Sequence, residues 1–124
     1  MSTIKGGTIE KASGDPVNLT KQDGVKAWCS WNMDSTQTIK DSLNISSLTD
    51  TGSGNSTLTV VNAFISTNSK APVCSAGFSS TNPSNKNLCG SVGSVTTCLF
   101  EGYSTANSLE DVPMCYTAIL GDLA

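Results

Sequence analysis

The chain has 124 residues, with seven Lys, no Arg, no His and ten Asp or Glu, and its formal charge is -3. This length fits one domain, which can bury a core without metal or disulfide cross-links. Because imidazole is the commonest general base and metal ligand, its absence excludes Ser-His-Asp and Cys-His hydrolases and histidine-based metal centres. Without a basic face we also expect no nucleic-acid partner.

Ser, Thr, Asn and Gly make up 55 of the 124 residues, so helix-favouring residues are scarce. This composition favours strands and turns over helices. The sequence therefore predicts an all-β fold, a small antiparallel β-sandwich or a barrel-like domain. No apolar run reaches 18 residues and the first residues do not resemble a signal peptide. We expect no membrane insertion and synthesis in a cytoplasm.

The first 24 residues differ from the rest of the chain. Their apolar residues stand singly among polar ones: Ile4, Ile9, Val17 and Leu19. Such sparse apolar residues favour an extended N-terminal arm over 1–24, with one helical turn at residues 19–23, that serves docking or oligomerisation. A frayed terminus is the alternative. Residues 25–124 are then the β domain.

The first strand is expected at residues 25–33, where apolar and polar side chains alternate. Trp28 falls on the side opposite the apolar face, so it stacks on a sugar, anchors the arm or packs in a subunit interface, and we favour the interface. A turn at 34–36 leads to a second extended segment over 38–42.

A hairpin is predicted across residues 43–61. Its first strand has a slipped apolar spacing that indicates a bulge, and its turn is the polar, glycine-containing stretch 50–55. Its second strand is residues 56–61. Further strands are expected at 71–75, 92–100 and 112–120, and an exposed loop at 79–87. The predicted core contains the apolar residues of these strands: Trp31, Met33, Leu58, Val60, Val95, Leu99, Met114 and Tyr116.

The five cysteines are widely spaced, odd in number and without a C-x-x-C pair: Cys29, Cys74, Cys89, Cys98 and Cys115. We expect reduced and mostly buried thiols that pack as small apolar side chains. A Cys89–Cys98 disulfide, which closes the shortest loop, is the alternative for a protein released into an oxidising medium.

Several blocks of the chain occur in an order that carries a family resemblance: STIK at 2–5, LTKQ at 19–22, KAW at 26–28, DSLNISSLTD at 41–50, GSG at 52–54 and AILGDLA at 118–124. The chain resembles short structural proteins and tail-fibre modules of marine and cyanobacterial tailed phages. This resemblance implies a virion component without enzymatic activity or cofactor, a homotrimer that contacts other virion proteins. We expect residues 1–24 to make that attachment.

Host attachment is the first functional hypothesis: polar loops on a rigid β scaffold bind a host-surface polysaccharide or protein. The candidate receptor contacts are Asn82, Asn85, Lys86, Asn87 and Tyr103. The candidate interface residues are Ile4, Ile9, Val17, Leu19 and Trp28. The second hypothesis is a decoration protein that stabilises a capsid or tube lattice, and a secreted lectin-like module is a weaker third.

Glycoside hydrolysis is the enzymatic alternative, because it needs only two carboxylates. The candidate carboxyl groups are Asp41, Asp50, Glu101, Glu110 and Asp111. Most lie in predicted turns or strand ends, where Asp and Glu are normally solvated or cap a turn. The sequence therefore predicts a non-enzymatic protein with no metal site.

Overall fold

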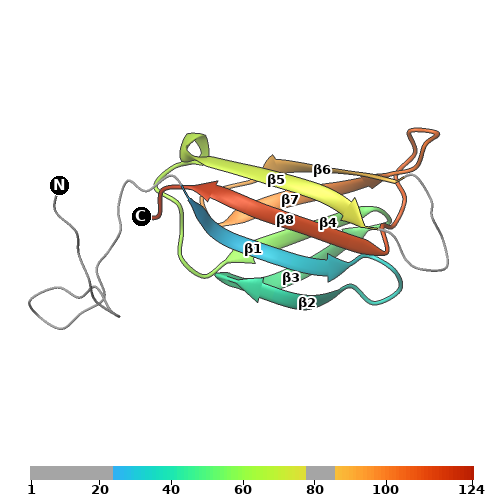
Figure 1. Ribbon diagram of the computed structural model, residues 1–124, viewed down its shortest axis with the longest axis horizontal. Coiled ribbons are helices and arrows are strands. Elements are labelled where there is room, and N and C mark those ends of the chain that lie inside the picture. The colour runs from blue at the N-terminus through green and yellow to red at the C-terminus, as the bar shows by residue number, and fades with distance from the viewer. Residues whose placement is uncertain (1–23, 78–85) are drawn as a thin grey trace, which may run out of the picture.

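The computed structural model describes residues 24–77 and 86–124, and it is a sandwich of two antiparallel four-stranded sheets (Figure 1). We call β2-β1-β8-β5 the front sheet and β3-β4-β7-β6 the back sheet. The strands are β1 (Val25–Asn32), β2 (Thr38–Leu43), β3 (Ile45–Gly52), β4 (Asn55–Val60), β5 (Lys70–Gly77), β6 (Asn87–Val92), β7 (Thr97–Tyr103) and β8 (Met114–Gly121). The all-β sandwich expected from composition and periodicity is confirmed. The arm predicted over 1–24 lies, apart from its last residue, outside the described residues.

The chain crosses from the front sheet to the back sheet through a single residue, Asn44, between β2 and β3. Its φ of 58° lies in the left-handed region, which Asn tolerates better than most residues. Its amide donates to the Lys26 carbonyl at 3.1 Å and its Oδ1 accepts the Asn62 backbone N–H at 2.9 Å. These bonds hold the corner where the two sheets meet.

The predicted hairpin around residues 50–55 is also confirmed, as β3 and β4. Its turn requires glycine at Gly54, where φ is +70° and a Cβ would lie 2.6 Å from the backbone nitrogen of Glu110. The Gly54 N–H donates to the Asp111 carboxylate at 2.6 Å. Only glycine lets the turn approach the segment before β8 this closely.

The core lies between the sheets and centres on Trp31 of β1, which is 1% exposed. Its indole meets the Phe100 ring of β7 edge to face, with centroids 5.0 Å apart. The indole N–H donates to Ser56 Oγ of β4 at 3.3 Å, and that hydroxyl donates to Gln37 Oε1 at 2.5 Å. The Trp31 side chain of the front sheet thus packs against β7 and donates a hydrogen bond to β4, so its polar atom is satisfied.

A second link between the sheets is Lys70 at the start of β5, which is only 6% exposed. Its ammonium donates to the carbonyl oxygens of Ser94 and Thr97 at 2.9 and 2.8 Å, and it lies 5.0 Å from the Phe64 ring centroid. Ser94 lies in the turn between β6 and β7, and Thr97 is the first residue of β7. The edge of the front sheet is therefore tied to a turn of the back sheet by charge-assisted hydrogen bonds.

Two sequence predictions about this half of the chain are wrong. The strand expected over 92–100 is a hairpin, because residues 93–96 turn between β6 and β7. Four predicted core residues are exposed, by 36–43%: Val95, Leu99, Met114 and Tyr116. In β7 and β8 the cysteines and every second residue from them point inward instead. Side chains alternate along a strand, so an error of one residue assigns all of them to the wrong face.

Three cysteines are buried in the core, as expected: Cys29, Cys98 and Cys115. All five are free, and the Cys89–Cys98 alternative is not formed, because Cys98 is buried while Cys89 is exposed on the same hairpin. Burial raises the pKa of Cys29 and Cys115 to about 12, and nearby carboxylates, Asp41 and Asp34 respectively, act in the same direction. These thiols stay protonated in the folded protein at neutral pH.

Replacing the buried lysine, Lys70→Met, should lower the free energy of unfolding by about 2 kcal/mol, because two inward carbonyl groups lose their donor. Lys40→Met is the matched control, since Lys40 is exposed on β2. Urea unfolding followed by tryptophan fluorescence measures both. Equal stability of Lys70→Met and wild type would show that the lysine does not tie the sheets together.

The buried thiols should also make stability fall as pH rises above 9. The unfolded chain releases these protons near the ordinary pKa of 9.0, whereas folded Cys29 and Cys115 hold theirs to about 12. Each thiol therefore lowers the free energy of unfolding by about 1.4 kcal/mol per pH unit in that window. Urea unfolding from pH 8 to 10.5 tests this. In the Cys29→Ala/Cys115→Ala variant the free energy of unfolding should fall less steeply with pH. The Cys89→Ala variant, which changes an exposed cysteine, should show the wild-type pH dependence.

Candidate interaction surfaces

The outer face of the front sheet is turned toward the viewer in Figure 1. The cross-strand register and the exposure of its residues place a band of apolar side chains on this face. Cross-strand register places Leu43, Trp28, Ala118 and Val73 in one row across its four strands. Leu43 and Val73 are 51% and 59% exposed, and Trp28 is half-buried between its neighbours. Trp28 thus lies on the outer face, as the alternation along β1 predicts, and its neighbours in the row are apolar.

Tyr116 of β8 extends this band toward the other end of the sheet. Its ring covers the backbone of β5, since a Cβ added to Gly77 would lie 2.6 Å from Tyr116 Cε2. Its hydroxyl donates to the Met114 sulfur at 3.7 Å. The missing side chain of Gly77 thus leaves the space that the Tyr116 ring occupies over β5. We call the outward side chains of the row and of β8 the apolar face: Leu43, Trp28, Val73, Met114, Tyr116, Ala118 and Leu120.

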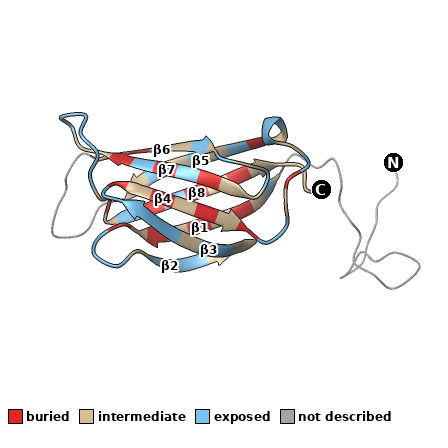
Figure 2. Ribbon diagram, turned by 180° about the vertical axis from the view of Figure 1, so that it is seen from behind, coloured by how far each residue is buried: buried red, intermediate tan, exposed pale blue. Residues whose placement is uncertain are grey.

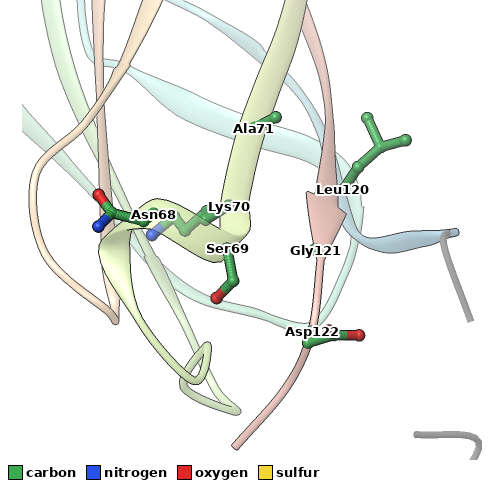
Figure 3. Close-up of a pocket in the computed structure, with 7 residues that line it drawn as sticks. All are labelled: Asn68, Ser69, Lys70, Ala71, Leu120, Gly121 and Asp122. Carbon is green, nitrogen blue, oxygen red and sulfur yellow. The ribbon is translucent and has the colours of Figure 1, made fainter. Parts of the chain in front are cut away.

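Two shallow hollows lie along the boundary between β5 and β8. One, of about 320 Å³, is bordered by Val73, Ser75, Tyr116 and Ala118. The other, of about 380 Å³, lies at the end of the same strands (Figure 3). There, Ala71 and Leu120 are neighbours across the strands, and Asn68 and Asp122 mark the polar limit.

The Lys70 side chain borders the second hollow but is directed away from Ala71 and Leu120 (Figure 3). Its ammonium is engaged by the Ser94 and Thr97 carbonyls and is nearly fully buried. The charge is therefore committed to the fold and does not turn this hollow into an anion site. The hollows combine apolar surface with uncharged hydrogen-bonding groups, Ser75 and Tyr116 at the first and Asn68 and Ser69 at the second, and Asp122 also borders the second.

The outer face of the back sheet, seen in Figure 2, has the opposite character. Its cross-strand rows consist mainly of hydroxyl side chains: Ser47, Thr59 and Thr97 in one, and Thr49, Thr57, Leu99 and Ser91 in the next. In these rows Leu99 is the large apolar side chain, 43% exposed. The sandwich thus has one outer face with an apolar band, where Tyr116 lies in a row with Asp41, Ser30 and Ser75, and one outer face that is rich in hydroxyl groups.

Part of the predicted receptor-contact set lies together at the end of the sandwich away from the C-terminus (Figure 1). Asn87 and Tyr103 are cross-strand partners in β6 and β7. The Tyr103 hydroxyl donates to the Glu101 carboxylate at 2.7 Å, and this bond raises the tyrosine pKa. Asn82 and Asn85 lie outside the described residues.

Lys86, the remaining candidate contact, already has intramolecular partners. Its ammonium is 2.7 Å from the Glu110 carboxylate and donates to the Asp111 carbonyl at 2.6 Å, and its side chain is 10% exposed. Lys86 therefore anchors the start of β6 to the segment before β8. Among the predicted interface residues, Ile4, Ile9, Val17 and Leu19 lie outside the described residues, so Trp28 alone is placed.

The five carboxyl groups considered for glycoside hydrolysis each bond within the fold. Asp41 and Asp50 accept backbone N–H groups next to them, and Asp111 accepts that of Gly54. Glu101 accepts Tyr103, and Glu110 pairs with Lys86. These bonds are the turn-capping and surface roles that Asp and Glu usually have in such positions.

Within residues 24–77 and 86–124, no three His, Cys, Asp or Glu side chains gather where they could hold a metal ion. The same ranges contain no helix of the length and apolarity needed to cross a bilayer. Comparison of the chain with protein-family models, curated proteins and solved structures found no significant match.

Proposed function

We propose that the protein is a non-enzymatic structural component of a phage particle, a short tail-fibre or appendage protein that assembles as a homotrimer and contributes to attachment to the host. The observation that carries this proposal is the opposite chemistry of the two outer faces. One face is apolar and suited to burial, and the other is covered with Ser and Thr hydroxyls. The blocks from Ser2 to Ala124 that resemble tail-fibre modules supply the particle type.

The apolar face supports an assembly role, because large exposed aliphatic side chains are costly to leave in water and mark contact sites when they are contiguous. Val73 and Leu43 are both more than half exposed in a row that also contains Trp28. Aromatic residues at the centre of such a face are typical anchors of protein contacts. This side of the sandwich is where we place contacts with other virion subunits.

The end formed by Asn87 and Tyr103 supports an adhesive role. A tyrosine ring and an amide side by side on neighbouring strands give a sugar ring both a stacking surface and hydrogen bonds. The hydrogen bond from Tyr103 to Glu101 fixes the phenol against the rigid β6–β7 hairpin. We therefore place the receptor contact at this end, on a host-surface polysaccharide or protein.

A capsid or tube decoration protein is the second candidate, because the same two faces suit it. The apolar face would lie on the lattice and the hydroxyl-rich back sheet would face water. Copy number separates the two roles, since a fibre is present as a few trimers per particle and a decoration protein in hundreds of copies.

Quantitative mass spectrometry of purified particles should find the chain in a few copies relative to the major capsid protein. A count in the hundreds would establish the decoration role instead. Absence from the purified particles, or release of reducing ends from host polysaccharide by the purified protein, would contradict the proposed function.

A further inference from the structure

We propose that the apolar face is the contact through which the chain associates with a second copy of itself. The inference deepens the proposed assembly role and commits the face to one occupant, but it does not depend on the kind of particle. The central strand of this face is β8, which lies between β1 and β5. The charged, bulged and covered edges of the sheet then leave the face as the route of contact.

Both sides of β8 lack charge. Its inward residues Cys115, Thr117 and Ile119 are buried in the core. Its outward residues are equally uncharged: Met114, Tyr116, Ala118 and Leu120. A strand that is apolar on both sides is typical of a sheet covered on both faces. Residues 24–77 and 86–124 leave the outward side of β8 uncovered, so its sequence fits an assembled state better than an isolated one.

The distribution of charge on the front sheet suits symmetric contact. In a symmetric assembly, residues near the axis meet their own copies, so a charge there would repel itself. On β5 and β8 the charged residue is Lys70, which is buried with its ammonium turned into the fold. The other charged residues of the sheet, Lys26, Lys40 and Asp41, lie on β1 and β2. The β5–β8 half can therefore meet itself without electrostatic cost.

The edges of the front sheet do not favour pairing with another strand. The β5 edge faces β6, and the Cys74 thiol donates to the Leu88 carbonyl at 3.1 Å. The β2 edge carries Lys40 and Asp41 and a register shift opposite Ser30 and Trp31. Charges and bulges are the usual means by which edge strands avoid pairing. A second copy is thus directed to the face rather than to an edge.

The area of the face is sufficient for a specific contact. The four strands, of six to eight residues, cover about 500 Å² at ordinary strand spacing and rise, so a contact of this area centres on β5 and β8 and extends over β1 and β2. Two such faces together bury about 1,000 Å², which reaches the lower limit of specific protein interfaces. Tyr116, held over Gly77, gives the contact a preordered aromatic side chain.

The test uses the full chain, of 12.8 kDa, in sedimentation velocity from about 1 to 100 μM. Wild type should sediment as an assembly of at least two copies. Val73→Asp and Met114→Asp should each weaken association at least about a hundredfold, because each buries an unpaired carboxylate in the contact. Both residues are exposed in the single chain, so both variants should melt close to wild type.

Leu99→Asp is the matched control, since Leu99 is similarly exposed on the outer face of the other sheet. It should leave association unchanged. A wild-type chain that stays monomeric at about 100 μM would overturn the inference and assign the face to a different partner, whatever the protein's place in a particle. Loss of association in Leu99→Asp, with Val73→Asp still assembled, would overturn it by moving the contact to the back sheet.

Discussion

The core between the two sheets is organised around one buried contact, the edge of the Trp31 indole against the Phe100 ring, with the indole N–H donated to Ser56. These three residues come from β1, β7 and β4, so the contact fixes both the spacing of the sheets and their relative orientation. Lys70 adds a second link at the edge, from β5 to the β6–β7 turn. Around Trp31 and Phe100 the core is filled by aliphatic side chains such as Leu58 and Ile119 and by the smaller Cys98 and Cys115.

This arrangement explains what the sequence could and could not predict. The sequence predicts which side of β1 faces the core, because apolar residues alternate with polar ones around Trp31. It also predicts the β3–β4 turn from its glycines. The sequence does not show which side of β7 or β8 faces the core. Both sides of β8 are uncharged, and the outward Leu99 of β7 is as apolar as the inward Phe100. A rule that puts the largest apolar side chains inside assigns Met114 and Tyr116 to the core, whereas cysteines occupy it. The part of the apolar face on β8 was missed for this reason, and of the whole face the sequence placed only Trp28 on the outside.

The same ambiguity has a functional meaning. When both sides of a strand are equally suited to burial, the sequence does not show which side faces the core of the single chain. It does indicate that both sides are covered in an assembly. The back sheet gives the contrast, since Thr57 and Thr59 alternate cleanly with buried Leu58 and leave hydroxyl groups toward water. Three surfaces thus differ in chemistry: the apolar face, for which we propose contact with another subunit, the hydroxyl-rich face, and the Asn87–Tyr103 end, for which we propose adhesion.

The central claim is that the outward side of β8 is covered when the protein assembles. Hydroxyl-radical footprinting of the chain at about 1 and about 100 μM measures this directly, because Met114 and Tyr116 are both readily oxidised and are 36% and 38% exposed in the single chain. Oxidation of both residues should fall at the higher concentration, while oxidation of Tyr103, which lies on β7 of the other sheet, should stay constant. Unchanged oxidation of Met114 and Tyr116, or protection of Tyr103 in their place, would contradict it.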